Sequence, residues 1–422
     1  MSGGKINGCF NCGAVTFSSG AIVGFDLTNS GTAGNTSAFV TALSGAMSAG
    51  AVYTLTVKSN MQTSGVYKLA SGASGFNESV TVYNDAGTRL GTLTVGQSTN
   101  LGCVQYKLTR SGSTLSVAVG GAKGDVDGNG VSDVMFVWTG EHGEGNHQHG
   151  YWMNGTNEWR SVNVSHPAEW ENLGAYDMNS DGKADSVLVG NVVVNGVKGA
   201  YIGYYADGND ADSNWINIGY LDNSGNYTWK NKVGNLTGNS GKNSIIWHNV
   251  ELGALGAWTD GTDKWVSLGG GYDSHWTLVG CGDFNGYGYD RVLMSYDNGA
   301  KYYSVSSTGE LVDEIATSDS GWTVRAIGDF SGDGKDDIVA FHKATGIVAK
   351  WADGRSSNWS QLGQLDAKDW FVVGAGDYNG DGTDDLLVRQ YSTGMLGYYS
   401  SGDMSQWNVL GYGVDMDWTV IA

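Results

Sequence analysis

The sequence has little proline and little charge. Only 1 of its 422 residues is proline, and charged residues make up 16% of the chain. Long exposed helices carry many charged side chains, so this composition excludes a protein built mainly from salt-bridged helices. The chain instead contains 68 glycines, 16 tryptophans and 22 tyrosines. Because aromatic residues favour strands and glycine favours tight turns, the composition predicts an all-β protein with many short strands.

Basic residues and long apolar runs are also scarce. The chain has 23 basic and 43 acidic residues, a formal net charge of −20, so a nucleic-acid partner is excluded and divalent cations are favoured. No run of about 18 apolar residues occurs, which excludes a transmembrane helix. No apolar core follows Lys5, so no signal peptide is present in this chain. We expect that a leader has been removed or that export uses another route.

Cysteine occurs at four positions: Cys9, Cys12, Cys103 and Cys281. The first pair forms one CxxC motif, but the second CxxC of a zinc site is missing. A local disulfide or free thiols are therefore favoured over metal or redox chemistry, and the pairing of the first three cysteines stays open. Cys281 lies in an apolar stretch and is predicted to be a small core residue.

A tryptophan recurs along the second part of the chain, at Trp170, Trp229, Trp276, Trp322, Trp370 and Trp418. The unit that begins at Trp370 predicts four strands, at 371–374, 385–389, 397–400 and 406–410. Four strands in about 48 residues is the size of a propeller blade, which buries its faces only by stacking on its neighbours.

The two ends of the repeat series complement each other. The series begins at Lys123 without its tryptophan strand and ends with an isolated strand at Trp418–Ala422. If the last strand completes the first blade, residues 121–422 form a six-bladed β-propeller without exposed sheet edges; seven blades is the alternative. Residues 1–120 predict a small domain rich in Gly, Ser and Thr, either a β-sandwich or a β-solenoid, with Ala38–Met47 as a candidate helix.

Four of the units carry the acidic loop Asp-x-Asp/Asn/Ser-Gly/Ser-Asp/Asn-Gly-x-x-Asp. Calcium prefers about six to eight oxygen ligands, and side chains at positions 1, 3 and 5 plus the carbonyl at position 7 can surround it. Position 12 is Phe136, Leu188, Ala340 or Val388 rather than the bidentate Glu of a helical calcium hand. The ninth residue is therefore expected to supply the closing carboxylate.

These units resemble FG-GAP or VCBS repeats, the calcium-loop blades of integrin α-chain propellers and of many secreted bacterial proteins. The resemblance covers about 300 residues and implies four calcium ions. The implied side-chain ligands are Asp125, Asp127, Asn129 and Asp133; Asp177, Asn179, Asp181 and Asp185; Asp329, Ser331, Asp333 and Asp337; and Asp377, Asn379, Asp381 and Asp385. The carbonyls of Val131, Lys183, Lys335 and Thr383 complete the implied sets.

Units three and four depart from this pattern, and we expect no tight ion in either. The fourth loop carries Tyr287, Tyr289 and Arg291, residue types that are frequent at interaction hot spots, so these three residues are candidate partner contacts. A second tryptophan series at Trp159, Trp215, Trp265, Trp359 and Trp407 predicts packing between blades more than sugar stacking. The His-rich segment 141–149 is a metal site or, more simply, a solvated hairpin.

The sequence thus predicts a secreted or cell-surface module, stabilised by calcium, for binding or adhesion to an extracellular glycan or protein. Loops without a bidentate Glu suit the high calcium concentration outside cells. No catalytic motif occurs, so we predict that the protein is not an enzyme. A structural surface-layer or fibre component and a carbohydrate-active enzyme on a propeller scaffold are the alternatives.

Overall fold

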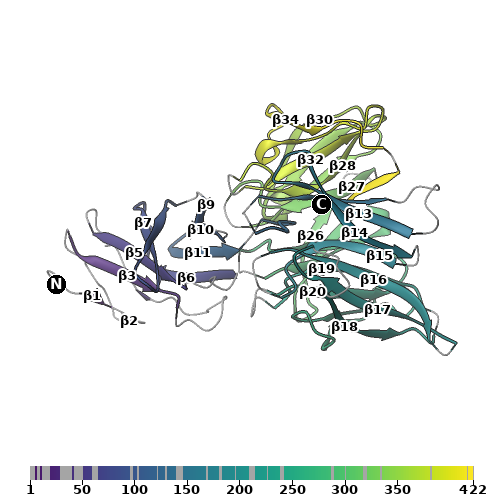
Figure 1. Cartoon of the computed structure of the whole chain (residues 1–422), viewed down its shortest axis with the longest axis horizontal. Helices are drawn as coiled ribbons and strands as arrows, with labels where there is room; N and C mark the ends of the chain where they lie inside the picture. The colour runs from purple at the N-terminus through teal and green to yellow at the C-terminus, as the bar shows by residue number, and fades with distance from the viewer. Residues whose placement is uncertain are drawn as a thin grey trace.

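Figure 1 shows a computed structural model of the chain, in which only strands and short 3-10 turns occur as regular elements of the described residues. It describes residues 5–6, 10–11, 20–28, 40–41, 51–58, 65–95, 98–101, 104–120, 122–128, 131–138, 146–167, 170–179, 183–194, 196–208, 214–225, 227–237, 242–286, 289–299, 301–316, 321–332, 335–380, 383–415 and 417–421. In these ranges no helix has the length and hydropathy needed to cross a membrane.

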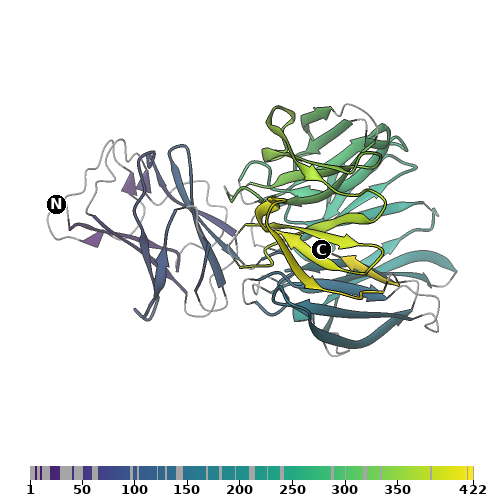
Figure 2. The same cartoon turned by 90° about the horizontal axis from the view of Figure 1, so that it is seen from above.

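The strands before Gly120 form two sheets that lie beside the later ones (Figure 1, Figure 2). One sheet has the order β1 (Lys5–Ile6), β3 (Ile22–Asp26), β5 (Val52–Val57), β7 (Val80–Asn84) and β8 (Arg89–Leu93). The other has the order β2 (Phe10–Asn11), β4 (Val40–Thr41), β6 (Gly65–Ser71), β11 (Thr114–Gly120), β10 (Val104–Ser111) and β9 (Ser98–Leu101).

The chain alternates between these two sheets at first, and its early strands pair in parallel: β1 with β3, β3 with β5, and β2 with β4. The two sheets share one core, in which the rings of Tyr53 and Phe76 meet edge to face at 4.9 Å. The described strands of this region therefore form two sheets packed on one shared core. The expectation of a helix at Ala38–Met47 is wrong at Val40–Thr41, which extends between β2 and β6.

After Gly120 the described residues form six four-stranded antiparallel sheets, here called propeller sheets 1 to 6. Sheet 1 consists of β14 (Glu158–Pro167), β13 (Asn146–Met153), β12 (Val134–Trp138) and β35 (Trp418–Ile421); sheet 2 of β15 (Trp170–Tyr176), β16 (Asp185–Val194), β17 (Val197–Tyr205) and β18 (Trp215–Asp222). Sheet 3 consists of β19 (Trp229–Gly234), β20 (Ser244–Asn249), β21 (Ala254–Trp258) and β22 (Trp265–Gly269); sheet 4 of β23 (Trp276–Gly282), β24 (Arg291–Tyr296), β25 (Lys301–Val305) and β26 (Leu311–Ala316). Sheet 5 consists of β27 (Trp322–Gly328), β28 (Asp337–His342), β29 (Ile347–Trp351) and β30 (Trp359–Gln364); sheet 6 of β31 (Trp370–Gly376), β32 (Asp385–Gln390), β33 (Leu396–Tyr399) and β34 (Trp407–Gly411).

Short 3-10 turns join some of these strands. They are η1 (Ala206–Gly208), η3 (Asp297–Gly299), η4 (Ala352–Gly354), η5 (Ser356–Asn358) and η6 (Ser400–Gly402).

The last strand completes the first propeller sheet, as the sequence predicts. In the antiparallel pairing of β35 with β12, Trp418 lies opposite Trp138 and Ile421 opposite Met135. Residues far apart in the chain thereby share one sheet, and the edge of β12 is covered. This arrangement of stacked four-stranded sheets is a β-propeller.

Four tryptophans of the second series cover glycines of their own sheets. Each of Trp159, Trp215, Trp265 and Trp407 lies over a glycine of the neighbouring strand in its own sheet: Gly150, Gly203, Gly256 and Gly397. A Cβ atom at Gly150 would be 2.2 Å from the Trp159 ring, so the indole needs the space that glycine leaves. Third-strand tryptophans make contacts between sheets, with Trp152 against Gly411 and Trp258 against Gly219. Trp407 also packs against a core that sheets 5 and 6 share.

Candidate metal centres

The acidic loops and their two degenerate counterparts form one ring at the centre of the propeller. This loop ring comprises residues 125–133, 177–185, 235–244, 283–291, 329–337 and 377–385, each of which leads into the second strand of its sheet. In each loop the backbone N–H of one residue donates a hydrogen bond to the carbonyl of the first residue of the preceding loop. The bonds, 2.6 to 3.1 Å long, run from Ala184 to Asp125, Asn243 to Asp177, Asp290 to Asn235, Asp336 to Asp283, Asp384 to Asp329 and Ser132 to Asp377.

The last of these bonds joins sheet 1 to sheet 6, so the ring closes at its loops as well as through β35. Three of the donor residues also accept a bond in return. The carboxylates of Asp290, Asp336 and Asp384 accept the N–H groups of Asn235, Asp283 and Asp329 at 2.8 to 2.9 Å. These reciprocal contacts connect neighbouring sheets. The sequence reasoning did not predict a role for the three aspartates. The feature of the sequence that marks them is an acidic residue directly before the second strand, as in Asp336–Asp337 and Asp384–Asp385.

The first loop brings three predicted ligands together. Carboxylate oxygens of Asp125, Asp127 and Asp133 lie within 4.8 Å of one another, and Asp125 and Asp133 are buried. Burial, together with the charges of Asp125 and Asp127, raises the pKa of Asp133 to about 7, although two backbone N–H groups act to lower it. A cluster of buried like charges with oxygen donors is suited to a hard divalent cation.

The ninth residue of each loop has a role that does not depend on an ion. One oxygen of Asp133, Asp185 and Asp385 accepts the N–H of the second loop residue, at 2.9, 2.8 and 3.0 Å. The other oxygen accepts the N–H of a residue with positive φ in the turn after the third strand, at 2.7, 2.9 and 2.8 Å. These turn residues are Asn154, Asp207 and Ser401. The ninth carboxylate therefore connects the loop to the third-strand turn.

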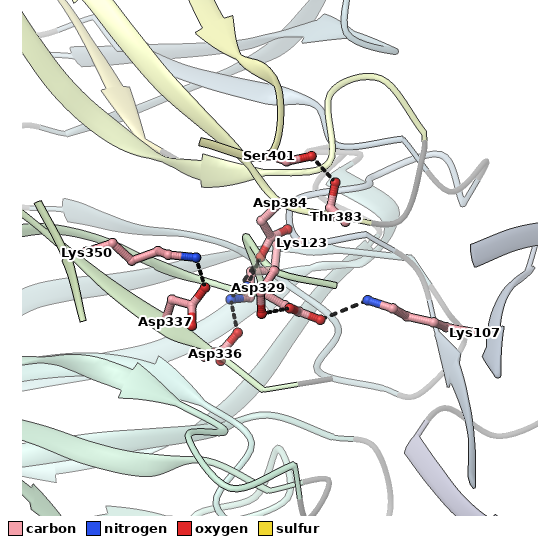
Figure 3. A network of polar contacts seen from close by, with 10 residues as sticks. Lys107, Lys123, Asp329, Asp336, Asp337, Lys350, Thr383, Asp384 and Ser401 are labelled. Atoms are coloured by element: carbon pink, nitrogen blue, oxygen red, sulfur yellow. Dashed lines mark hydrogen bonds and ion pairs between the residues drawn. The ribbon is translucent and has the colours of Figure 1, made fainter. Parts of the chain in front are cut away.

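The fifth-sheet loop differs, because lysines contact two of its predicted ligands (Figure 3). Lys350 Nζ lies 3.0 Å from Asp337 Oδ2 and takes the place that the N–H of the second loop residue has in the other three loops. The second contact is kept, because the Asp353 N–H donates to Asp337 Oδ1 at 2.9 Å. Lys107 of β10 reaches Asp329 Oδ2 at 2.8 Å. Burial raises the pKa of Asp337 to about 6, against the lowering effects of the Asp353 N–H and of Lys350.

The predicted ligands at the fifth loop position, Asn129, Asp181, Asp333 and Asp381, lie outside the described residues. The third-position residues Asp127, Asn179, Ser331 and Asn379 and the seventh-position residues Val131, Lys183, Lys335 and Thr383 are described. The amide nitrogens of Asn179 and Asn379 face Asp185 Oδ1 and Asp385 Oδ1 at 3.5 and 3.3 Å. The glycines at the fourth position turn as predicted, with φ of 79° at Gly128, 70° at Gly332 and 71° at Gly380.

The candidate partner contacts of the fourth loop are only partly described, because Tyr287 lies outside the described residues. Tyr289 and Arg291 are half-buried. When the Asn285 amide is oriented to satisfy both groups, its oxygen accepts from Arg291 Nε at 2.9 Å. Arg291 thus supports its own loop.

Other metal candidates contribute no further cluster in the described residues. Glu141–Gly145 lies outside them, whereas His149 is buried in β13 with Nδ1 3.3 Å from Asn172 Nδ2. Cys9, Cys12 and Cys103 are likewise not described, and Cys281 is a free thiol packed at the edge of the core of sheets 3 and 4.

A lysine of the segment before the first loop enters the centre of the ring. Lys123 Nζ lies 3.1 Å from the Ile327 carbonyl, 3.2 Å from Asp336 Oδ1 and 3.6 Å from Asp384 Oδ2 (Figure 3). Asp290 belongs to the same cluster of charged side chains as Lys123 and Asp336. Its removal from bulk water, together with the Asp336 charge, raises the pKa of Asp290 to about 7, although Lys123 opposes this rise.

Replacing Asp290 with Asn is expected to flatten the pH dependence of stability. An unfolded Asp titrates near pH 3.9, so between about pH 4 and 7 the folded state binds more protons than the unfolded state. The unfolding free energy of the parent therefore falls as pH rises through this window. Asn stays neutral and can still accept the Asn235 N–H, so Asp290→Asn should be more stable than the parent at pH 7 to 8.

Denaturant unfolding at intervals between pH 4 and 8 measures this effect. Asp263→Asn, at an exposed site, is the control and should follow the parent. Parallel curves for the parent and Asp290→Asn would show that Asp290 does not carry a raised pKa.

An aromatic groove of about 250 Å³ lies at the seam between sheets 6 and 1. Its lining consists of Phe136, Trp152, Trp159, Tyr412, Gly413, Val414, Asp415 and Trp418. Trp159 is 44% exposed and Tyr412 69% exposed. The buried Arg389 stabilises the backbone that lines the groove. Its guanidinium donates hydrogen bonds to the carbonyls of Val414, Asp415 and Trp418 at 2.7 to 2.9 Å. The groove is therefore preformed.

No known family matches the sequence, and no curated protein matches it. Several solved structures resemble the chain in fold. The match to a chain of a nidogen/laminin complex has a TM-score of 0.38 at 10% identity, and it covers 69% of this chain and 97% of the matched chain. A periplasmic gluconolactonase from Pseudomonas aeruginosa has 0.39 at 13% identity, covering 67% and 82%. The Dos1 propeller has 0.37 at 9% identity, covering 74% of each chain.

One prediction needs correction. The sequence led us to predict that the protein is not an enzyme, and this is wrong as a deduction from the fold, because a gluconolactonase is among the similar propellers. At 13% identity the likeness concerns the fold alone and does not show that the activity is shared. The absence of familiar catalytic motifs therefore does not exclude catalysis on this scaffold.

Proposed function

We propose that the protein is a secreted or cell-surface propeller of the FG-GAP/VCBS type, which calcium stabilises and which binds an extracellular glycan. In this proposal the six propeller sheets are six blades, and residues 1–120 form a separate domain from 121–422. The observation that carries the proposal is the cluster of Asp125, Asp127 and Asp133 in a loop that recurs around the ring.

The first-loop residues fit a calcium ion by their chemistry. All donors are oxygens, two of the three carboxylates are buried, and their charges repel one another. Calcium would neutralise this repulsion and rigidify a loop that is bonded to both neighbouring sheets. The same role is proposed for the loops that begin at Asp177, Asp329 and Asp377. Loops of this kind suit affinities near the calcium concentration outside cells, which supports the extracellular location.

The aromatic groove supports a glycan as the partner. Sugar rings have an apolar face that stacks on indole rings and hydroxyl groups that donate to carboxylates, and the groove offers both through Trp159 and the exposed Asp415. The fourth-loop residues Tyr287, Tyr289 and Arg291 remain a second proposed contact region, on the loop ring rather than at the seam.

A glycan array with and without calcium tests this function. The parent is expected to bind a defined glycan set in calcium, and Trp159→Ala should weaken binding at least about tenfold, because the groove would lose its main anchor. Trp265→Ala is the matched control, since Trp265 is 43% exposed and covers Gly256 just as Trp159 covers Gly150. Arg291→Ala tests the alternative region. Equal binding by both tryptophan variants would contradict a glycan site at the seam.

A further inference from the structure

We infer that calcium binding to the fifth-sheet loop and docking of the N-terminal sheets oppose each other, because Lys107 holds the predicted ligand Asp329. This inference rests on the proposed calcium sites. It adds a regulatory coupling that the sequence pattern alone does not contain, since the two residues are 222 positions apart.

The position of Lys107 on its strand explains why it reaches the propeller. Its neighbours on β10, Tyr106 and Leu108, are buried in the core of the N-terminal sheets, so Lys107 points to the opposite face. Its side chain is only 9% exposed, and its ammonium lies 2.8 Å from Asp329 Oδ2 (Figure 3). The same ammonium would be 3.7 Å from a Cβ atom at Gly332, the glycine of the loop turn. Lys107 is therefore seated against the loop.

In this loop lysines contact both the first and the ninth predicted ligand. Asp133, Asp185 and Asp385 each accept two backbone N–H groups. At Asp337 one of these donors is replaced by Lys350, at 3.0 Å. Asp329 and Asp337 are thus each paired with an ammonium group, Asp337 with one from its own sheet and Asp329 with one from the N-terminal sheets.

A calcium ion bound at Asp329 would share one carboxylate with the Lys107 ammonium. If Lys107 stays, two cations lie a few ångströms apart in a partly buried place; if it leaves, the domain contact loses its partly buried ion pair. Either path makes calcium binding and docking antagonistic. Because coupling between two binding events is reciprocal, docking weakens calcium binding by the same factor by which calcium weakens docking.

Calcium titration calorimetry of the full chain tests this coupling. Lys107→Gln removes the charge but keeps a flexible polar side chain, and it should tighten one calcium site by about 5- to 150-fold, the usual range of such coupling. Lys107→Arg keeps the charge and should resemble the parent. Arg110→Gln is the matched control, because it removes a positive charge from the same strand, where the Arg110 guanidinium donates to the carbonyls of Ser74 and Phe76 at 3.2 and 2.8 Å and not to a predicted calcium ligand.

A second measurement follows docking directly. Hydrogen exchange of β10 should become faster in the parent when calcium is added, whereas in Lys107→Gln calcium should cause no further change. Calcium binding with equal affinities in the parent and Lys107→Gln would overturn this inference and leave the proposed function intact. Absence of calcium binding in every variant would overturn both.

Discussion

A chain that ends at Asp417 is expected to lose most of its stability. The missing strand, β35, pairs with β12 over Trp418–Ile421. The ring of Trp418 also packs against Phe136, Trp138 and Trp159, with centroids 5.1 to 6.5 Å apart. Truncation would expose the edge of the buried strand β12 and remove aromatic core, so the loss should exceed the roughly 0.5 to 3 kcal/mol of typical single substitutions.

Denaturant unfolding and light scattering measure this loss, because an open strand edge also promotes aggregation. Deleting Ala422 alone is the control for shortening the chain, and Trp418→Ala separates ring packing from strand pairing. A truncated chain that melts like the parent and stays monomeric would show that the bonds of the loop ring suffice to close the propeller.

Removal of calcium is the second change with a large expected effect. A ligand that binds only the folded state adds about 2.7 kcal/mol per site at a hundredfold excess over Kd, so four sites together would dominate the stability of the propeller. Excess chelator should therefore lower the melting temperature strongly, and calcium should restore it. A melting temperature that does not respond to chelator, with no heat of calcium binding, would contradict the metal assignment.

The effect of one first-loop substitution on stability should change sign when calcium is added. Asp125→Asn keeps an acceptor for the Gly128 N–H, which donates to Asp125 Oδ1 at 2.7 Å, but removes one of the charges that raise the pKa of Asp133. In chelator this variant should be at least as stable as the parent, because repulsion is relieved. In calcium it should be less stable, because a ligand charge is lost. Asp283→Asn, in a loop expected to hold no tight ion, should show no calcium-dependent difference.

The repeat made much of the propeller predictable. Each tryptophan of the first series begins the first strand of a sheet, and the lone strand at Trp418 completes the sheet of β12. The series is Trp170, Trp229, Trp276, Trp322, Trp370 and Trp418. Both features follow from a period and from an unmatched strand at each end, which are visible without knowing any contact. Phe136, Leu188, Ala340 and Val388 lie buried in second strands, as their apolar surroundings indicate.

Contacts between units were harder to predict. Equivalent positions in a repeat share an environment, but the period does not say which neighbour they face, so the contact of four second tryptophans with glycines of their own sheets was not predicted. The bonds of Asp290, Asp336 and Asp384 to the preceding loop were missed for the same reason. The contact of Lys107 with Asp329 depends on how two unrelated regions dock, and no local pattern encodes it.

The hydrogen bonds of the loop ring also bear on how the protein folds during synthesis. The bond from Ser132 to Asp377 joins residues 245 positions apart, whereas the other bonds of the ring join residues 53 to 66 positions apart. Closing the longer loop costs only about 0.6 kcal/mol more for each doubling of its length, but contacts between distant residues slow folding. Sheets 2 to 6 can each form soon after the ribosome releases them. Sheet 1 emerges before them and is completed last, so an open ring with β12 as its free edge is the intermediate that a chaperone would have to protect.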